Sequence, residues 1–137
     1  MSNQERKVRW NDGAEREYEK GFSETLRDKI DLALLEIAAG DDPDEPKITL
    51  SPHGQPFDND VWKLKIKDRA GTYRVVYFRA YREAIYVVNA YQKKSHKGSE
   101  EPQEKIKSTR SRLKWAEAEH EAYLEEQAEK AKKGGSR

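Results

Sequence analysis

Residues 61–78 read VWKLKIKDRAGTYRVVYF, and this stretch decides the class of fold. In its first half apolar and basic residues alternate, which is the two-residue period of a strand with one face in the core. Its second half is apolar on both faces except at Arg74, as expected of an inner strand covered on both sides. The segment 69–71 predicts a turn between them. The predicted hairpin carries three ammonium groups on one face, those of Lys63, Lys65 and Lys67.

Two further strands are predicted around this hairpin. Residues 84–91 follow a tight turn at residues 81–82 and are apolar on both faces. Near the amino terminus, residues 7–10 alternate polar and apolar side chains and predict a short first strand. Together these segments predict a mostly antiparallel sheet.

Two helices are predicted between the first strand and the hairpin. Residues 12–18 form a short helix that Asp12 caps and Gly21 ends. A longer helix begins at Ser23 and ends at Gly40. Apolar residues recur along it at helical spacing and form one stripe that faces the sheet. This stripe consists of Phe22, Leu26, Ile30, Ala33, Leu34 and Ile37.

The remaining stretches predict a loop and a last helix. Residues 41–46 contain two prolines and four acidic residues, so we predict an acidic loop over 41–60. The segment 99–102 ends in a proline and predicts a helix start, followed by a thin apolar stripe. Beyond about residue 127 the composition predicts fraying to residue 137.

The length of 137 residues fits one domain, so we predict a single α+β domain over 1–137 with the two early helices on one face of the sheet. The chain has no cysteine, which excludes disulfides, thiolate zinc sites and cysteine nucleophiles. Its first residues are charged and contain no apolar run, so neither a signal peptide nor a membrane span is predicted. We therefore expect a cytoplasmic protein.

Charge is distributed unevenly, although the net charge is only +1. Residues 61–98 contain ten Lys and Arg against two Asp and Glu, whereas residues 41–60 contain one basic and six acidic residues. A concentrated basic region in a nearly neutral protein favours a local anionic partner over general adhesion to polyanions.

Side chains in the basic region suit metal-free cleavage of RNA. In that reaction a 2′-hydroxyl attacks the neighbouring phosphate, one group takes its proton, another protonates the leaving 5′-oxygen, and cations stabilise the phosphoryl oxygens. Adjacent strands lie about 4.8 Å apart, so side chains from three strands can reach one phosphate. The candidate catalytic residues are Lys63, Lys65, Arg74, Lys94 and His96. The candidate RNA-binding residues are Lys67, Arg69, Tyr91, Lys93 and Lys97.

The same residues have plainer interpretations. Alternating lysines also mark the solvated face of an edge strand, where they discourage aggregation. A lone histidine such as His96 in a polar loop is more often simply solvated, although histidine titrates close to working pH. Arg74 differs, because an unpaired guanidinium in an apolar strand is costly. It therefore predicts either a carboxylate partner or a ligand groove.

No metal or cofactor is predicted. His53 and His120 are expected to be ordinary side chains, and the three scattered histidines lack the spacing of metal ligands. The acidic run 41–45 lacks the ordered spacing of a calcium loop and is better explained as a solvated linker.

The hairpin resembles the central hairpin of RelE-superfamily toxins. Their pattern is an aromatic residue, alternating basic residues, a glycine turn and then Tyr-Arg in an apolar strand, and residues 61–67 and 71–77 match it. Residues 87–95, VVNAYQKKS, resemble the end of the third strand in phage Gp49-like HigB toxins, where an aromatic residue and a Lys-Lys pair precede a helix. The resemblance covers about residues 7–115 and is most specific over 61–95.

The resemblance implies a RelE-like fold and the toxin of a type II toxin–antitoxin system. It implies a ribosome-dependent mRNA endonuclease, neutralised by a cognate antitoxin that is usually a helix-turn-helix protein. Lys63 and Lys65 match the basic pair on the family's second strand. Arg74 matches its phosphate-stabilising arginine, and Lys94 matches a basic residue after the last strand.

Two departures and two alternatives accompany the resemblance. The tyrosine that some RelE toxins carry near the carboxyl end of the site has no clear match, and His96 is our hypothesis for its substitute. The last helix also exceeds the usual length. A ParE-like toxin that inhibits DNA gyrase without enzymatic activity is an alternative, although the site lysines favour the nuclease. A nucleic-acid-binding module without activity is another.

Overall fold

The computed structural model describes residues 6–93 and 102–135, with side chains described up to residue 133. Within these residues the chain forms five strands and three helices. In chain order they are β1 (Lys7–Trp10), α1 (Asp12–Gly21), α2 (Glu24–Ala38), β2 (Ile48–Pro52), β3 (Val61–Asp68), β4 (Gly71–Phe78), β5 (Ala84–Lys93) and α3 (Gln103–Gly135).

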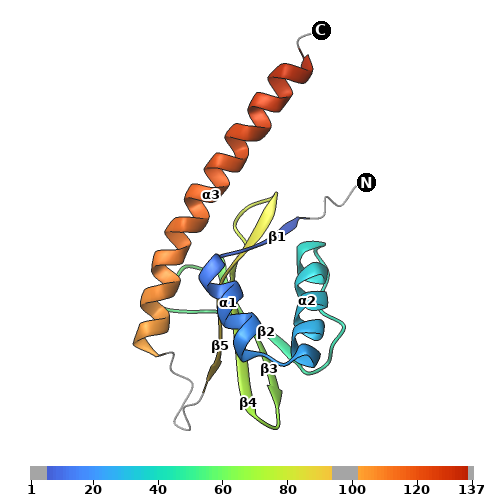
Figure 1. The fold of residues 1–137 in the computed structure, drawn as a ribbon, viewed down its shortest axis with the longest axis vertical. Helices are drawn as coiled ribbons and strands as arrows, with labels where there is room; N and C mark the ends of the chain where they lie inside the picture. The colour runs from blue at the N-terminus through green and yellow to red at the C-terminus, as the bar shows by residue number, and fades with distance from the viewer. Residues whose placement is uncertain (1–5, 94–101, 136–137) are drawn as a thin grey trace.

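All described strands belong to one sheet, in the order β1-β5-β4-β3-β2. β1 runs parallel to β5, and the other neighbouring pairs are antiparallel. Helices α1 and α2 lie against one face of the sheet and α3 crosses the other (Figure 1). The predicted α+β class, with a mostly antiparallel sheet and two amino-terminal helices on one face, is therefore confirmed.

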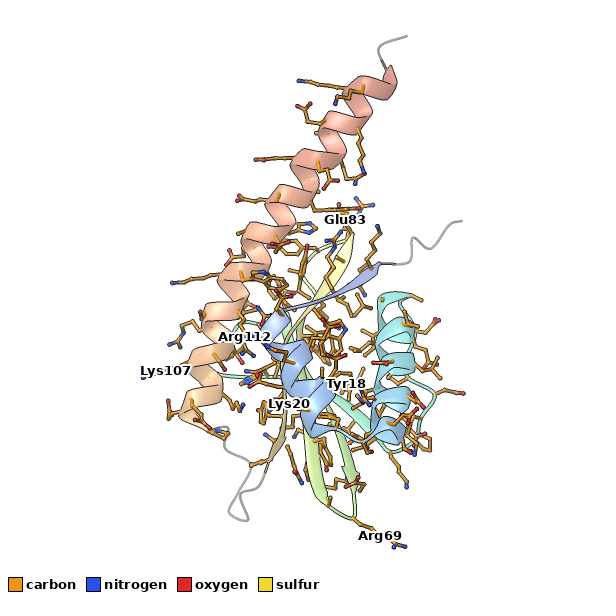
Figure 2. The ribbon with its side chains drawn as sticks, viewed as in Figure 1. Tyr18, Lys20, Arg69, Glu83, Lys107 and Arg112 are labelled. Carbon is orange, nitrogen blue, oxygen red and sulfur yellow. The ribbon has the colours of Figure 1, made fainter. Side chains whose placement is uncertain are left out.

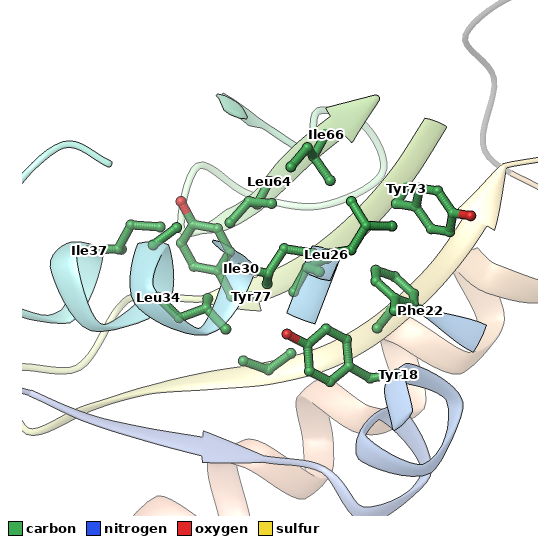
Figure 3. Close-up of a cluster of buried hydrophobic side chains, with 14 of the residues drawn as sticks. Tyr18, Phe22, Leu26, Ile30, Leu34, Ile37, Leu64, Ile66, Tyr73 and Tyr77 are labelled. Atoms are coloured by element: carbon green, nitrogen blue, oxygen red, sulfur yellow. The ribbon is translucent and has the colours of Figure 1, made fainter. Parts of the chain in front are cut away.

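An apolar layer fills the space between the sheet and the first two helices. The stripe of α2 packs there against alternate residues of the three central strands, as Figure 3 shows for Ile30 and Leu34 beside Leu64 and Tyr77. A smaller cluster around Tyr86 lies on the opposite face, beneath α3. Each face of the inner strands is therefore buried, which explains why β4 and β5 are apolar in both registers.

The helix starts differ slightly from prediction. The cap of α1 is Asn11, whose side chain accepts hydrogen bonds from the backbone nitrogens of Gly13 at 3.0 Å and Ala14 at 3.2 Å. The prediction that Asp12 is the cap was therefore wrong by one residue. Asp12 lies instead in the first turn, where a carboxylate interacts favourably with the helix dipole. Ser23 caps α2 as predicted, with Oγ accepting from the Leu26 nitrogen at 3.2 Å.

Residues 41–60 are not one acidic loop, because β2 lies within them and pairs antiparallel with β3. Ile48 and Leu50 pack against the core between the sheet and the helices, and this burial holds the strand in place. The prediction rested on the prolines and the charge of the whole stretch. It overlooked the alternation of apolar and polar side chains over residues 48–51. The consequence is that β3 is an inner strand rather than an edge strand.

Helix α3 continues to Gly135, where the sequence predicts fraying from about residue 127. Alanine, glutamate and lysine are strong helix formers, and Lys130 lies 3.4 Å from the Glu126 carboxylate one turn earlier. The far end of α3 projects beyond the sheet (Figure 1). Neither α3 nor another helix in the described part of the chain is long and apolar enough to span a membrane.

Candidate active site

The alternation along β3 separates its basic from its apolar side chains. Leu64 and Ile66 belong to the core beneath α1 and α2, so Lys63 and Lys65 lie on the opposite face of the sheet. We call this side the basic face, defined by Lys63, Lys65, Lys67, Arg74, Tyr91 and Lys93.

The strand register brings the members of the basic face into rows. Lys65 on β3 is the direct partner of Arg74 on β4, and Arg74 is the direct partner of Tyr91 on β5. One row nearer the hairpin tip, Lys67 faces Thr72, which in turn faces Lys93. Directly opposed residues have Cβ atoms about 4.5–5.5 Å apart, so Arg74 lies within reach of the side chains on both sides.

A β-bulge places Tyr91 and Lys93 on this face. The register of β4 and β5 shifts between Val76 and Tyr77, so one residue of β5 has no partner across the ladder. Val88 packs in the cluster beneath α3 and the adjacent Asn89 bonds to α3, so two successive side chains point to the same side. With strict alternation from Val88, Tyr91 would lie instead on the face that α1 and α2 cover.

Three cations of the basic face are buried. The exposed fraction is 4% for Arg74, 7% for Lys63 and 8% for Lys93, and each of the three has interaction partners in the structure. Buried charges are expensive unless they are partnered. Lys65 is partly buried, and Lys67 is exposed. The row of Lys65, Arg74 and Tyr91 is therefore largely buried, with the exposed Lys67 at its margin, unlike the solvated edge strand of the plainer interpretation.

The first turns of α3 cover the β5 side of the row. Lys105 Nζ lies 5.1 Å from the centroid of the Tyr91 ring, a cation–π distance. The Tyr91 hydroxyl is buried and has no hydrogen-bond partner among the described residues. An unsatisfied buried hydroxyl is costly, and a substrate oxygen is one group that could satisfy it.

An anchor of three residues holds α3 in this position. Arg112 Nη1 donates to Glu17 Oε1 at 2.9 Å and to Asn89 Oδ1 at 3.1 Å, and thus joins α3 to α1 and β5 (Figure 2). Asn89 Nδ2 donates in turn to Ser108 Oγ at 2.9 Å. Sequence reasoning missed this anchor. One signal was available at Gly13, where a Cβ would lie 2.6 Å from Arg112 Nη2.

A hollow of about 600 Å³ opens beside the row at the hairpin end of the sheet. Its lining includes three lysines and two threonines, which can neutralise and hydrogen-bond an anion such as a phosphate. Lys47 is among them and was missed because it falls in the stretch predicted as an acidic loop. The residues around the hollow are Lys47, Thr49, Lys65, Ile66, Lys67 and Thr72.

The remaining predicted site residues are Arg69, Lys94, His96 and Lys97. Arg69 lies at the tip of the β3–β4 hairpin and points away from the body of the protein (Figure 2). Lys94, His96 and Lys97 lie outside the residues that the structure describes.

The two histidines expected to be ordinary are both buried. His120 Nδ1 lies 3.0 Å from the Tyr86 hydroxyl, its Nε2 lies 3.0 Å from Glu83 Oε1, and its ring stacks on Tyr81. Burial raises the pKa of Tyr86, which therefore stays protonated. These contacts of His120 tie α3 to the end of the sheet farther from Lys65 and Arg74. Within the described ranges, no three His, Asp or Glu side chains are placed to share a metal ion.

Comparison with known proteins gives a family match. Residues 17–114 match the family described as Phage derived protein Gp49-like (DUF891), which is a toxin-like family of the RelE/HigB type and suggests an antitoxin partner. The match begins within α1, continues through the sheet strands β2 to β5 and ends in the first turns of α3, and so spans the whole basic face. No curated protein and no solved structure gives a significant match. The chain thus belongs to the phage-derived Gp49-like family, as the resemblance of residues 61–77 and 87–95 predicted.

Proposed function

We propose that this protein is the toxin of a toxin–antitoxin pair and that it cleaves messenger RNA on the ribosome without a metal ion. The observation that carries the proposal is the cross-strand row in which Lys65 and Tyr91 flank the buried guanidinium of Arg74. The toxin-like family supports the biological role. The lysine-lined hollow beside the row supports a polyanionic substrate.

The chemistry needs two proton transfers and a stabilised phosphate. The 2′-oxygen bonds to the adjacent phosphorus while the bond from phosphorus to the 5′-oxygen breaks, which leaves a 2′,3′-cyclic phosphate and a 5′-hydroxyl. We assign Arg74 to the phosphoryl oxygens, because a guanidinium donates two parallel hydrogen bonds to such a group. We assign the two proton transfers to the group formed by Lys63, Lys65, Lys94 and His96. We assign RNA binding to Lys67, Arg69, Tyr91, Lys93 and Lys97.

The first test is to map RNA ends in a bacterium that expresses the protein. We expect new messenger ends inside codons within minutes of induction, and at least a 100-fold loss of these ends in Arg74→Ala, since removing one donor to a developing anion costs roughly that factor. Arg74→Lys keeps the charge but loses the paired donors, so an intermediate loss is expected. Arg82→Ala is the matched control, because Arg82 is an exposed arginine in the turn before β5, away from the row.

Folding must be checked in parallel, because Arg74 is buried. The urea midpoint of each purified variant shows whether lost cleavage reflects lost structure. An unchanged pattern of ends in a folded Arg74→Ala protein would contradict the proposal. DNA breaks that precede the arrest of translation would support a ParE-like gyrase inhibitor instead.

The proposed partner is a small helix-turn-helix antitoxin, and the proposed place of action is the cytoplasm, where ribosomes are found. We expect growth arrest on expression of the toxin alone and recovery when a helix-turn-helix protein encoded beside it is co-expressed. Co-purification of the two proteins measures the complex directly.

A further inference from the structure

A second pocket lies on the same side of the sheet as the basic face. It has a volume of about 360 Å³ and is formed where the start of β3, the end of β4 and α3 meet. Its walls combine two aromatic rings, two aliphatic side chains, a proline ring and two carboxylates. The residues that form these walls are Phe57, Phe78, Val61, Leu113, Pro56, Asp58 and Glu117.

The pocket continues the line of the basic face along β3. Val61 packs beneath α3 on the same side as Lys63 and Lys65, and the four residues from Lys65 to Val61 span about 13 Å. A nucleic acid strand with one phosphate at Lys65 and Arg74 can therefore place a base further along the strand in this pocket. The lysine-lined hollow lies at the opposite end of the same line, toward the hairpin tip.

The aromatic walls are fixed in position. Phe57 packs edge-on against the buried His53 ring at 4.8 Å, and its backbone nitrogen donates to the Gly54 carbonyl at 3.0 Å. Phe78 packs edge-on against Tyr81 at 5.3 Å. Pre-positioned rings of this kind are the usual platform for an unpaired base. The guanidinium carbon of Arg110 lies 5.9 Å from the Phe57 ring and can meet the phosphate of such a nucleotide.

The carboxylates are the unusual part of this pocket. Acidic groups repel phosphates, so the exposed carboxylates of Asp58 and Glu117 favour a ligand group that donates hydrogen bonds over a phosphate. An ionised carboxylate only accepts hydrogen bonds. Guanine, adenine and cytosine carry an exocyclic amino group that donates, whereas uracil presents carbonyl oxygens at the corresponding positions.

We propose that this pocket binds one base of the RNA and selects a base with an exocyclic amino group over uracil. Asp58 and Glu117 are the residues that determine this specificity, and Phe57 and Phe78 hold the ring. One Asp58 oxygen already accepts from the Asp60 nitrogen at 2.9 Å, which fixes the carboxylate and leaves its other oxygen for a base. The proposal rests on the proposed function and deepens it, since it names a base that the nuclease reads along the strand from the cleaved phosphate.

Direct binding to the full-length protein tests the pocket without cleavage. The chain has three phenylalanines, so fluorophenylalanine labelling gives three ¹⁹F NMR signals. Phe22 lies in the core on the other face of the sheet and serves as an internal control. We expect GMP, AMP and CMP to shift the Phe57 and Phe78 signals but not that of Phe22. UMP should bind at least about 10-fold more weakly, a typical discrimination for a base contact.

Isosteric substitutions identify the carboxylates. In Asp58→Asn combined with Glu117→Gln the preference against UMP should fall to about 2-fold, because an amide can both donate and accept. The Asp58→Asn substitution retains one side-chain oxygen to accept from the Asp60 nitrogen, so the loop should keep its shape. Glu125→Gln, an exposed glutamate two turns further along α3, is the matched control and should leave the preference unchanged.

The outcomes separate this inference from the proposed function. Equal affinity for UMP and the other nucleotides, or no shift of Phe57 and Phe78 with any of them, overturns the base pocket even if the protein cleaves RNA. Selective shifts in a protein without Arg74-dependent cleavage leave the pocket standing and overturn the nuclease. If both hold, the mapped ends should be depleted of uracil at one fixed position along the strand from the cut, and the double substitution should abolish this depletion.

Discussion

Arg74 and Tyr91 are direct cross-strand partners, and neither is the residue type that stability alone favours for a buried position in an apolar strand. Arg74 places a guanidinium in an apolar strand beside Lys65, and Tyr91 carries a buried hydroxyl without a hydrogen-bond partner among the described residues. Like charges in adjacent positions and unsatisfied polar groups both lower the free energy of unfolding. Residues of this kind gather at functional sites, where stability is given up for binding or chemistry.

Tyr91→Phe tests this trade-off at a single atom. The variant keeps the ring and removes only the hydroxyl, so we expect the free energy of unfolding to stay the same or to rise by up to about 1 kcal/mol. RNA cleavage should fall about 10-fold if the hydroxyl bonds to the substrate. Urea unfolding and cleavage assays measure the two effects. Tyr123 is a half-buried tyrosine on α3, and Tyr123→Phe is the control that should change neither stability nor cleavage. A marked loss of stability in Tyr91→Phe would argue for a structural role of the Tyr91 hydroxyl.

At the scale of elements, α3 is held by two hydrogen-bonded clusters from opposite ends of the sheet. Arg112 connects it to Glu17 and Asn89 near the basic face, and His120 connects it to Tyr86 and Glu83 at the other end. The apolar stripe of α3 is thin, and Ala116 is its one described residue in the buried core. Polar anchors therefore determine where this helix lies.

Removal of the first anchor should affect both stability and activity. Arg112→Ala is expected to lower the free energy of unfolding by about 2 kcal/mol, because it breaks two charge-assisted side-chain bonds and leaves Asn89 with an unmet acceptor. Cleavage should fall as well, since α3 would no longer cover Tyr91. Urea midpoints and cleavage rates measure this. Combining it with Glu17→Ala should cost less than the two single losses added together.

Lys107→Ala is the matched control for that experiment. Lys107 is an exposed cation on the same part of α3, on the side away from α1 (Figure 2). We expect the free energy of unfolding of the Lys107→Ala protein to differ from that of the unsubstituted protein by less than about 0.5 kcal/mol. A similar loss in both variants would show that the helix, and not the anchor, responds to the substitution.

At the scale of the whole molecule, the main core lies between the sheet and the first two helices and contains several tyrosines. Burial raises the pKa of Tyr77 to about 12, and burial together with the Asp31 carboxylate raises the pKa of Tyr18 as well. The folded protein therefore holds its tyrosine protons more tightly than the unfolded chain. The tyrosines should contribute fully to the free energy of unfolding below about pH 10, where they are still protonated in the unfolded chain. This contribution should decline as the pH rises further.

Alkaline unfolding checks this sign. Between pH 10 and pH 12 the contribution of Tyr77 should be lost, which amounts to about 2–3 kcal/mol for a shift of about two pH units. Tyr77→Phe keeps the packing of the ring and removes the titrating group, so its unfolding free energy should fall less steeply over this range. Urea unfolding at pH 9, 10 and 11 measures the difference. Parallel curves for the two proteins would exclude Tyr77 as the source.

The projecting end of α3 should be dispensable for the fold. Every described side chain from Leu124 onward is exposed, and this part of the helix extends past the sheet (Figure 1). A chain that ends at Glu126 should keep its unfolding free energy within about 0.5 kcal/mol and its cleavage rate within 2-fold. Urea unfolding and RNA cleavage measure both. A large loss of cleavage with unchanged stability would assign the projection to binding of the ribosome or the substrate.

The sequence by itself determined the hairpin, the two early helices and the basic run, because each rests on a period of two or 3.6 residues that neighbouring residues establish. Only the tertiary structure decided which cations meet. The bulge that turns Tyr91 and Lys93 to the basic face depends on pairing between β4 and β5, and Lys47 reaches the hollow only because β2 docks on β3. Arg112 and Glu17 are 95 residues apart, and nothing local links them. Periodicity is a property of adjacent residues, whereas a site depends on contacts between segments that the chain separates.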